Sequence, residues 1–565
     1  MMRVLLYSKF HDGNIADSLG LPEYSYYFVF REFYRVLKDS FNVEIVTEFE
    51  DLDTSIGADP DDCRLILFSP PNKVPIRKPR CKSYILFAWE FDSLPDGSWS
   101  KNLVENWTHM LRQYDGAITL SDHTANVVRR NLGDNYPVAA IPVPVWNKFS
   151  LGKLDKKMVS NAIDKSITLA VTGSVVDSAC YEITAEEYFV EKAIDNFSFP
   201  DWNGDHIDIP VSDNDEYSSF LIGFYAPEVW GVWSKLKTPS FLIPYKLQGA
   251  VSLVIDCAGY NSCSNQEIVI SLGGEKCTVK LSPEFKEITV DFVLKEPASL
   301  LAFNDLNCHV VPESSDPRSM GLGLRKISIK ARDIGEHKQS GIISGILNVD
   351  ISGVVYTSVF NPVDKRKNWP DIVSAFCNEF KGDDNVVLVL KMTHVKVTSF
   401  LGKFHDLLQK LSPFKCRVIA IHGYLDSSSF TELIQVSNFY VNASSAEGLC
   451  LPLMEYMSSA VPAITPSHTA MESYVDQQSC FILDSGLEPT HWPPDPMRRY
   501  TTSQYRVPWE SIREQFRMSY DCILNRPEEY VDKANAATEK LKAYSSDDVV
   551  LDKITNFLFA GSLQT

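Results

Sequence analysis

Short apolar runs alternate with helical stretches over roughly the first 150 residues of the chain. Two of the stretches, Tyr24–Leu37 and Leu103–Arg112, carry their apolar residues at helical spacing. The remaining runs have the length of buried strands, and they are Val4–Tyr7, Val43–Val46, Leu65–Phe68, Tyr84–Ala88, Ala117–Leu120 and Ala139–Pro142. This alternation predicts a parallel sheet covered by helices.

The pattern changes between about residues 165 and 335. Short strands follow one another there, separated by Gly, Pro, Asn and Ser, and no long helical stretch intervenes after about residue 195. The clearest strands are Val251–Asp256, Glu267–Leu272, Cys277–Leu281, Glu287–Phe292 and Arg325–Lys330. Strands spaced in this way predict an antiparallel β-sandwich.

The strand–helix alternation returns from Gly353 onward. Helical patterns cover Asp371–Phe380 and Ser428–Val436, and Trp509–Ala560 is mostly helical. Strands are predicted at Val354–Val359, Val386–Lys391, Arg417–His422, Phe439–Asn442, Val461–Thr465 and Cys480–Leu483. We therefore predict an α/β protein in four parts: residues 1–150, an insert at 165–335, a second α/β part at 350–510, and helices at 511–565 that pack back towards the first part.

The charge and cysteine content narrow the class of protein. With 54 basic and 73 acidic residues the net charge is −19, which argues against a nucleic-acid partner because phosphate binding needs a basic surface. The 12 cysteines form no C-x-x-C pair, so neither a metal site nor a disulfide framework is expected. No apolar run approaches the roughly 20 residues of a membrane span, and no signal peptide is recognisable. Together these features predict a cytoplasmic protein.

One stretch, Ser445–Glu455, combines a strand end, a glycine loop and a helix start. Pro452 suits the first turn of a helix, and a helix that begins at the carboxyl end of a strand suits a diphosphate. Glu447 lies in the loop and Glu455 in the second helical turn, so both can face one ligand. A carboxylate accepts hydrogen bonds from vicinal hydroxyls, which riboses and sugars carry.

A second stretch, Ser358–Trp369, holds three consecutive basic residues in a loop before a helix. Cationic donors suit a diphosphate, and Arg366 and Lys367 are the preferred candidates, with Lys365 also available. Lys391, at the end of another predicted strand, can reach the same cleft. A solvated basic turn is the alternative interpretation.

Ser445–Glu455, together with Ser459–Ile464 and the upstream His422–Leu425, resembles the donor-binding signature of retaining GT-B glycosyltransferases of family 4. The resemblance is strong over about residues 353 to 485 and weak over 1 to 150. It implies two Rossmann-like domains that face each other across a cleft. It also implies that Glu455 binds the nucleotide ribose, that Glu447 contacts the donor sugar, and that the backbone at Gly448, Leu449 and Cys450 faces the donor.

In the same family an Arg and a Lys neutralise the leaving diphosphate, which points to Arg366 and Lys367, although the loop departs from the usual spacing. The resemblance implies transfer of a hexosyl unit, with mannose the first expectation, from GDP-mannose or a UDP-sugar to a glycan in bacterial surface polysaccharide (O-antigen) synthesis. No metal and no further cofactor are expected, and contact with the inner face of the plasma membrane or an assembly complex is possible. The alternative is a non-catalytic sugar-binding scaffold on a decayed transferase fold.

The acceptor side is less marked in the sequence. Glu90 and His123 follow predicted strands of the first part, where the family holds its acceptor, and the loop Ser8–Pro22 contains Gly13 and Gly20 at the position where the family brings backbone close to the donor. In the insert, Trp230 and Trp233 either stack on sugar rings or fill the core. We favour the core, because buried aromatic residues dominate such cores.

Overall fold

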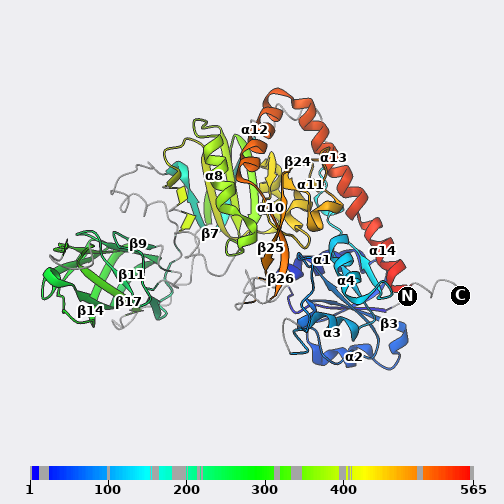
Figure 1. Ribbon diagram of the computed structural model, residues 1–565, viewed down its shortest axis with the longest axis horizontal. Coiled ribbons are helices and arrows are strands. Elements are labelled where there is room, and N and C mark those ends of the chain that lie inside the picture. Colours follow the sequence, from blue (N-terminus) through cyan, green and yellow to red (C-terminus); the bar gives the residue numbers. More distant parts are fainter. Residues whose placement is uncertain are drawn as a thin grey trace.

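The computed structural model of the chain describes residues 3–11, 24–97, 102–152, 154, 165–180, 199, 201–212, 217, 220–310, 318–331, 346–393, 403–404, 407–408, 410–492, 495 and 500–559. Two α/β halves lie side by side, a β-rich body stands to one side, and helices of the tail span both halves (Figure 1). The chain is therefore an α/β protein with parallel sheets.

The N-terminal half is built on a six-stranded parallel sheet in the order β2-β1-β3-β4-β5-β6. Its helices include α1 (Ser25–Leu37), α3 (Trp107–Arg112) and α4 (Asp122–Leu132). The strands are β1 (Arg3–Tyr7), β2 (Asn42–Val46), β3 (Cys63–Phe68), β4 (Lys82–Phe87), β5 (Gly116–Thr119) and β6 (Val138–Ala140). All six predicted strands of this half are confirmed, because apolar runs buried on both faces are characteristic of parallel sheets.

The C-terminal half contains an eight-stranded sheet in the order β18-β7-β21-β20-β19-β22-β23-β24. Six of these strands are parallel and match the predicted runs: β19 (Val354–Phe360), β20 (Val386–Met392), β21 (Arg417–Tyr424), β22 (Phe439–Val441), β23 (Ala463–Pro466) and β24 (Cys480–Leu483). Of these six parallel strands, β19 comes first in the sequence, yet it lies between β20 and β22 in the sheet. The strand order therefore reverses at the β19–β22 junction. Ligands of open α/β sheets bind at such a junction.

Two further strands of this sheet come from outside the predicted C-terminal part. β7 (Ser166–Asp177) pairs antiparallel with β21 through one end and with β18 (Ile346–Ser352) through the other. The predicted insert boundary at residue 165 is therefore wrong, because β7 belongs to the C-terminal sheet. Its alternating pattern alone resembles a sandwich strand, and only the pairing distinguishes the two.

The insert itself is an antiparallel, eight-stranded sheet. Two long strands, β11 (Ser240–Gly259) and β14 (Lys286–Asn304), run through it with register shifts after Leu242 and Leu247. The other strands are β8 (Ile207–Pro210), β9 (Leu221–Ile222), β10 (Val232–Trp233), β12 (Glu267–Leu272), β13 (Glu275–Lys280) and β17 (Leu322–Ala331). One end of β11 pairs with β9 and the other with β17, so the two long strands join two groups of strands.

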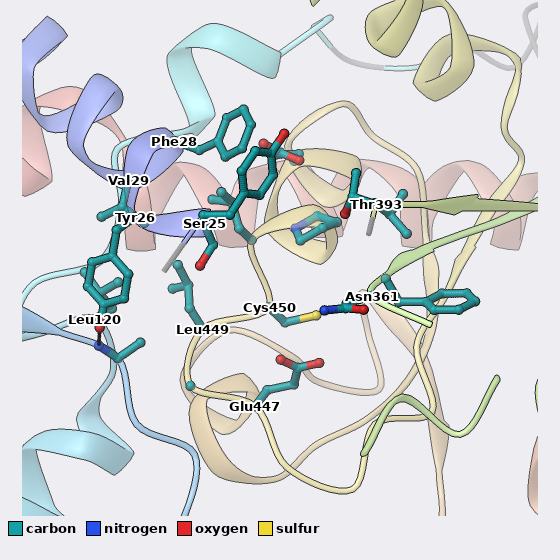
Figure 2. Close-up of a pocket in the computed structure, with 18 of the residues that line it drawn as sticks. Ser25, Tyr26, Phe28, Val29, Leu120, Asn361, Thr393, Glu447, Leu449 and Cys450 are labelled. Carbon is teal, nitrogen blue, oxygen red and sulfur yellow. Dashed lines mark hydrogen bonds between the residues drawn. The ribbon is translucent and has the colours of Figure 1, made fainter. Parts of the chain in front are cut away.

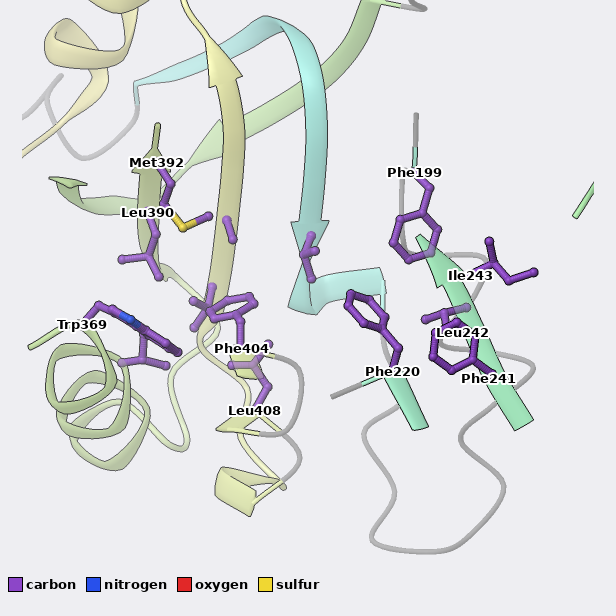
Figure 3. Close-up of a cluster of buried hydrophobic side chains, with 14 of the residues drawn as sticks. Phe199, Phe220, Phe241, Leu242, Ile243, Trp369, Leu390, Met392, Phe404 and Leu408 are labelled. Atoms are coloured by element: carbon purple, nitrogen blue, oxygen red, sulfur yellow. The ribbon is translucent and has the colours of Figure 1, made fainter. Parts of the chain in front are cut away.

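The buried core of the insert is continuous with that of the C-terminal half. Phe220 and Phe241 lie on one side of β7, and Trp369 and Phe404 lie on the other (Figure 3). The insert is thus anchored to the C-terminal half by packing as well as by the chain.

The tail consists of α12 (Trp509–Asn525), α13 (Pro527–Ser545) and α14 (Asp547–Phe559). α14 reaches the N-terminal half, where Arg35 of α1 binds both oxygens of Asp547 at 2.7 and 2.8 Å. Phe559 stacks on Phe41 with the ring centroids 5.4 Å apart. Within the described part of the chain, no helix combines the length and the apolar character needed to cross a bilayer.

A hairpin of β25 (Gly486–His491) and β26 (Thr501–Arg506) connects the two halves at another place. The Tyr505 amide donates to the Ser445 carbonyl at 2.8 Å in the C-terminal half. The Asp92 carboxylate of the N-terminal half accepts from the Thr502 hydroxyl at 2.7 Å and from the Ser503 amide at 3.1 Å. The sequence pattern did not predict this hairpin.

Candidate functional site

A cavity of about 650 Å³ lies between the two halves, at the carboxyl ends of their strands. In Figure 2, Tyr26 and Phe28 of α1 lie across the cavity from Asn361, which follows β19, while Glu447 and Cys450 of the loop after β22 lie near Asn361. The reversal of strand order between β19 and β22 therefore opens directly into this cavity.

The loop after β19 presents Arg366 to the cavity between two carboxylates. The guanidinium contacts Oε1 of Glu90, in the N-terminal half, at 2.5 Å and Oδ2 of Asp364 at 2.7 Å. Burial raises the pKa of Glu90 even though Arg366 acts in the opposite direction. Burial would also raise the pKa of Asp364, but the cations of Arg366 and Lys367 outweigh it, and the pKa is lowered.

Lys367 pairs with the predicted donor-sugar carboxylate. Its Nζ lies 2.6 Å from Oε1 of Glu447, which is 5% exposed as a residue. The two loops are also joined through the backbone, because the Ser445 amide donates to the Arg366 carbonyl at 2.9 Å. The Asn368 side chain donates to the Ala443 carbonyl at 2.8 Å. Both loops are therefore held in one arrangement around the cavity.

Helix α11 (Leu451–Ser458) begins at the wall of the cavity. Its preceding residue, Cys450, has a left-handed backbone with φ 61°, a conformation that is costly for a residue other than glycine. Gly448 approaches the N-terminal half so closely that a Cβ atom would lie 3.0 Å from the Trp89 amide nitrogen. The start of α11 thus lies at the wall of the cavity, and a helix N-terminus stabilises an anion.

Deeper in the cavity lie Lys391, at the end of β20, and Glu455 of α11. Among the described residues, neither the Lys391 ammonium nor the Glu455 carboxylate makes a hydrogen bond or an ion pair. Burial lowers the pKa of Lys391 to about 7 and raises the pKa of Glu455 to about 8. Buried ionisable groups that lack a partner within the protein are expected where a ligand binds.

The N-terminal half adds cations that sequence reasoning missed. Lys148 and Arg31 line the same cavity, and Lys148 binds Oε1 of the buried Glu32 at 2.5 Å. Asp364 was also missed, although its position directly before the basic run was a usable signal. Lys148 offered none, because it lies far in sequence from Glu32, the residue it binds.

The structure brings all eight predicted donor-site residues to one cavity: Arg366, Lys367, Lys391, Glu447, Gly448, Leu449, Cys450 and Glu455. Glu90 also lines it, whereas His123 does not. The His123 ring nitrogen contacts the Phe91 carbonyl at 3.3 Å, and burial lowers its pKa. Gly13 and Gly20 lie outside the described residues.

A metal site is not formed by the parts of the chain that the structure describes, since no three His, Cys, Asp or Glu side chains gather in a suitable way. The cavity is lined by cations, by the start of a helix, and by carboxylates that can accept hydrogen bonds from hydroxyl groups. A molecule with a diphosphate and vicinal hydroxyls fits this set of groups.

Residues 199–331 match a family described as a domain of unknown function (DUF7024). This range covers the insert without β7 and β18. No curated protein matches the chain.

Several solved structures align with the chain at low similarity. Anabaena Alr3699/HepE, solved with UDP and glucose, aligns over 99% of this chain and 100% of its own, with 8% identity and a TM-score of 0.42. A glycosyltransferase from Rickettsia africae aligns over 38% of this chain, with 14% identity and a TM-score of 0.28, and the match spans 50% of the Rickettsia chain. The C-terminal domain of a group 1 glycosyl transferase, LpcC of Francisella tularensis, aligns over 34% of this chain and 86% of its own, with 15% identity and a TM-score of 0.26.

Proposed function

We propose that the chain is a retaining GT-B glycosyltransferase that moves a hexosyl unit from a nucleotide diphosphate sugar to a glycan. The observation that carries the proposal is the meeting of two loops at the strand-order reversal. One bears Arg366 and Lys367, and the other bears Glu447 and leads into α11. The resemblance of Ser445–Glu455 to the family's donor signature supports the same assignment.

The roles follow from the chemistry of the donor. Arg366, Lys367 and the first amides of α11 stabilise charge that develops on the leaving diphosphate. Lys391 adds a cation at the depth of Glu455, which binds ribose hydroxyls, while Glu447 orients the hexosyl unit. The acceptor hydroxyl bonds to the anomeric carbon as the bond to the diphosphate breaks, and its proton passes to a phosphate oxygen. The protein thus contributes position and charge.

The finer points of the proposal concern substrate and setting. Mannose from GDP-mannose is the first candidate donor, with a UDP-sugar the second, and the product is bacterial surface polysaccharide such as O-antigen. The insert is an antiparallel β-sandwich module. The enzyme acts in the cytoplasm, at the inner face of the plasma membrane where a lipid-linked acceptor is presented.

A panel of nucleotide sugars measured by thermal shift and calorimetry tests the donor assignment. At about 100 times Kd a bound donor stabilises the fold by roughly 2.7 kcal/mol, which is readily measured. Glu455→Gln should weaken donor binding, because the amide replaces one oxygen that faces the ribose hydroxyls with an NH2 group. Glu447→Gln should mainly lower kcat, since a hydrogen bond to a charged group contributes about 1.5–3 kcal/mol. Unchanged Kd and kcat in both variants would refute the donor site.

The second candidate function is a non-catalytic sugar-binding scaffold. The ion pairs of Arg366 with Asp364 and Glu90 favour the scaffold, because the two carboxylates lie where a diphosphate would bind Arg366. A scaffold of this kind would bind glycan and turn over no nucleotide sugar. Release of free nucleotide in the presence of a glycan acceptor distinguishes the two.

A further inference from the structure

Five aromatic side chains of the insert lie outside its buried core. Tyr225, Trp230, Trp233, Tyr260 and Phe285 are each partly exposed. The other described aromatic residues of residues 199–331 either belong to the core cluster or pack against it. The interpretation of Trp230 and Trp233 as core residues is therefore wrong, because both stand at the surface.

Four of these rings, those of Trp230, Trp233, Tyr260 and Phe285, are in mutual contact, and together with the neighbouring Tyr225 we term them the aromatic cluster. Trp233 is central, with ring centroids 5.0 Å from Trp230 and 5.1 Å from Tyr260. Phe285 adds contacts of 5.4 Å to Trp230 and 6.2 Å to Trp233. Tyr225 joins the group through the chain, because its amide donates to the Trp233 carbonyl at 2.9 Å.

The cluster rests directly on the backbone of β17. A Cβ atom at Gly323 would lie 2.7 Å from Trp233 Cζ3 and 2.8 Å from Phe285 Cζ. Glycine is therefore required at position 323 for the rings to hold this position. The rings are fixed before any ligand binds, which reduces the entropy lost on binding.

The turn that carries Trp230 places two large apolar residues at its tip. Glu228 and Gly231 exchange backbone hydrogen bonds of 2.7 and 3.1 Å, which leaves Val229 and Trp230 as a two-residue hairpin loop. Neither residue has a positive φ, so this turn does not require Asn, Asp or Gly. Val229 is 80% exposed. An apolar side chain exposed beside a group of rings extends the apolar surface, and such surfaces mark interaction sites.

Charged side chains surround the rings in fixed positions. The Glu228 carboxylate accepts from the Trp230 indole at 2.9 Å and binds Arg318 at 2.8 Å. The Arg325 guanidinium lies 3.8 Å from the centroid of Phe285. Aromatic faces offer the apolar side of a pyranose ring a contact, and carboxylate and guanidinium groups beside them bind its hydroxyls.

We propose that the aromatic cluster, with Glu228, Arg318 and Arg325, is a binding surface for the pyranose rings of a glycan chain. The ligand is uncharged or weakly charged, because Glu228 pairs with Arg318 and the three charged groups of the surface sum to only +1, on a chain whose net charge is −19. An anionic lipid surface is disfavoured for the same reason. This inference rests on the proposed function in one respect, namely that the bound glycan is the acceptor polymer.

The surface lies away from the cavity between the halves. Gly323 is near the start of β17, whereas the end of β17 at Ala331 leads towards β18. About 3.3 Å per residue of strand separates the two ends by roughly 25 Å. A polymer bound at the aromatic cluster would therefore be held by a site remote from transfer, which raises its effective concentration at the cavity.

Binding of the full chain to immobilised linear glucans and mannans of six or more residues tests the proposal. Trp230→Ala should raise the glycan Kd at least about tenfold, as expected for removal of a central aromatic anchor. Glu228→Gln should raise it by a smaller factor. Val293→Ala is the matched control, because Val293 is 53% exposed on β14 of the same sheet but outside the cluster.

Three results would overturn the proposal: a wild-type chain that binds no glycan of the panel, a folded Trp230→Ala variant with wild-type affinity, or Trp230-dependent binding to phosphatidylglycerol vesicles. If Trp230→Ala does not fold, Glu228→Gln decides, and its unchanged glycan Kd is then the contradicting result. UDP-glucose affinity is measured in parallel. A chain that binds UDP-glucose but no glycan would contradict this inference alone. A chain that binds glycan but no nucleotide sugar would contradict the proposed function alone.

Discussion

At the scale of single residues, the charges around Arg366 and Lys367 do not balance in the unliganded protein. These two cations face Asp364, Glu90 and Glu447, so two positive and three negative charges leave a net charge of −1. A diphosphate adds more negative charge to this group. Glu90 lies on the opposite half from the other four residues, so it is the carboxylate that a relative movement of the halves can remove.

Replacing the two cations tests the diphosphate site. Arg366→Ala with Lys367→Ala should lower kcat/KM by roughly a hundredfold or more, because they stabilise charge on the leaving group. Lys365→Ala is the control, since Lys365 is exposed in the same short helical turn and is not among the residues that line the cavity. Normal turnover of the double variant, with a normal melting temperature, would move the role to Lys391.

Removing the carboxylate from Glu90 should strengthen donor binding. In Glu90→Gln, Arg366 keeps its contact with Asp364 but loses a competing anion, so the Kd for a nucleotide diphosphate should fall by up to about tenfold. Glu472→Gln makes the same change of net charge at an exposed site. Calorimetry that finds weaker binding in Glu90→Gln would show that Glu90 holds Arg366 in place instead.

Donor affinity should depend on pH through Lys391 and Glu455. Burial places the pKa of Lys391 at about 7 and that of Glu455 at about 8. As the pH rises from 6 to 8, Lys391 loses its positive charge and Glu455 gains a negative one, and both changes disfavour a diphosphate. UDP-glucose, whose diphosphate does not titrate in this interval, should therefore bind more weakly at pH 8.

The two variants separate these contributions. Lys391→Met should reduce the pH dependence of the UDP-glucose Kd, and Glu455→Gln should remove the part that remains near pH 8. An unchanged pH profile in Lys391→Met, measured by calorimetry, would place the diphosphate away from Lys391.

At the scale of elements, the β25–β26 hairpin connects the loop of Glu447 to the N-terminal half. Tyr505 binds the Ser445 carbonyl and stacks on His468 with the ring centroids 4.2 Å apart, while Thr502 and Ser503 bind Asp92. Burial lowers the pKa of His468 to about 4, so this ring stays neutral near pH 7. The hairpin therefore fixes the distance between the two walls of the cavity.

Breaking this connection should lower both stability and turnover. Asp92→Ala removes the acceptor of two hydrogen bonds and should lower stability by about 1–3 kcal/mol. It should lower kcat by about tenfold or more, because small misplacements of reacting groups are costly. Asp134→Ala, at an exposed site of the same half, is the control. Equal kcat in the two variants would mean that the walls are held elsewhere.

The elements that sequence patterns predict are those with a regular burial pattern, either uniform or alternating. The parallel strands, such as Val386–Met392, are buried along their whole length, and the run of apolar residues indicates this directly. The β25–β26 hairpin is half exposed and contains Pro489, so neither period of apolar residues marks it. The predicted donor residues other than Lys391 cluster in two short stretches, and the structure brings both stretches to one cavity. Lys148 completes the cavity through its contact with the distant Glu32, which a pattern within one segment does not encode.

At the scale of the whole molecule, the insert is joined to the C-terminal half through β7, β18 and a shared core. Deleting residues 181–345 and bridging with a flexible linker keeps both strands. The UDP-glucose Kd should then stay within about twofold, because the cavity is built from other elements. Activity on long glycans should fall more than activity on short ones, since remote binding energy is lost.

A wider deletion provides the comparison. Removing residues 165–335 also takes away β7, which covers the edge of β21 and whose Asp177 binds Arg417 at 2.9 Å. An uncovered central strand and an unpaired Arg417 should prevent stable folding. If both deletion proteins fold equally well by calorimetry, β7 is not part of the structural core.

The attachment of the insert through an antiparallel pair at the sheet edge has an evolutionary consequence. The six parallel strands β19 to β24, which include those that carry the cavity, pair with one another independently of the residues between β7 and β18. A gene segment encoding the residues between β7 and β18 can therefore be lost, gained or replaced without disturbing the cavity residues to which we assign the proposed transfer. Under the proposed function, the module that binds the polymer and the cavity that binds the donor can therefore evolve independently. Grafting another module between Asp177 and Ile346 would redirect the same chemistry to a different polymer.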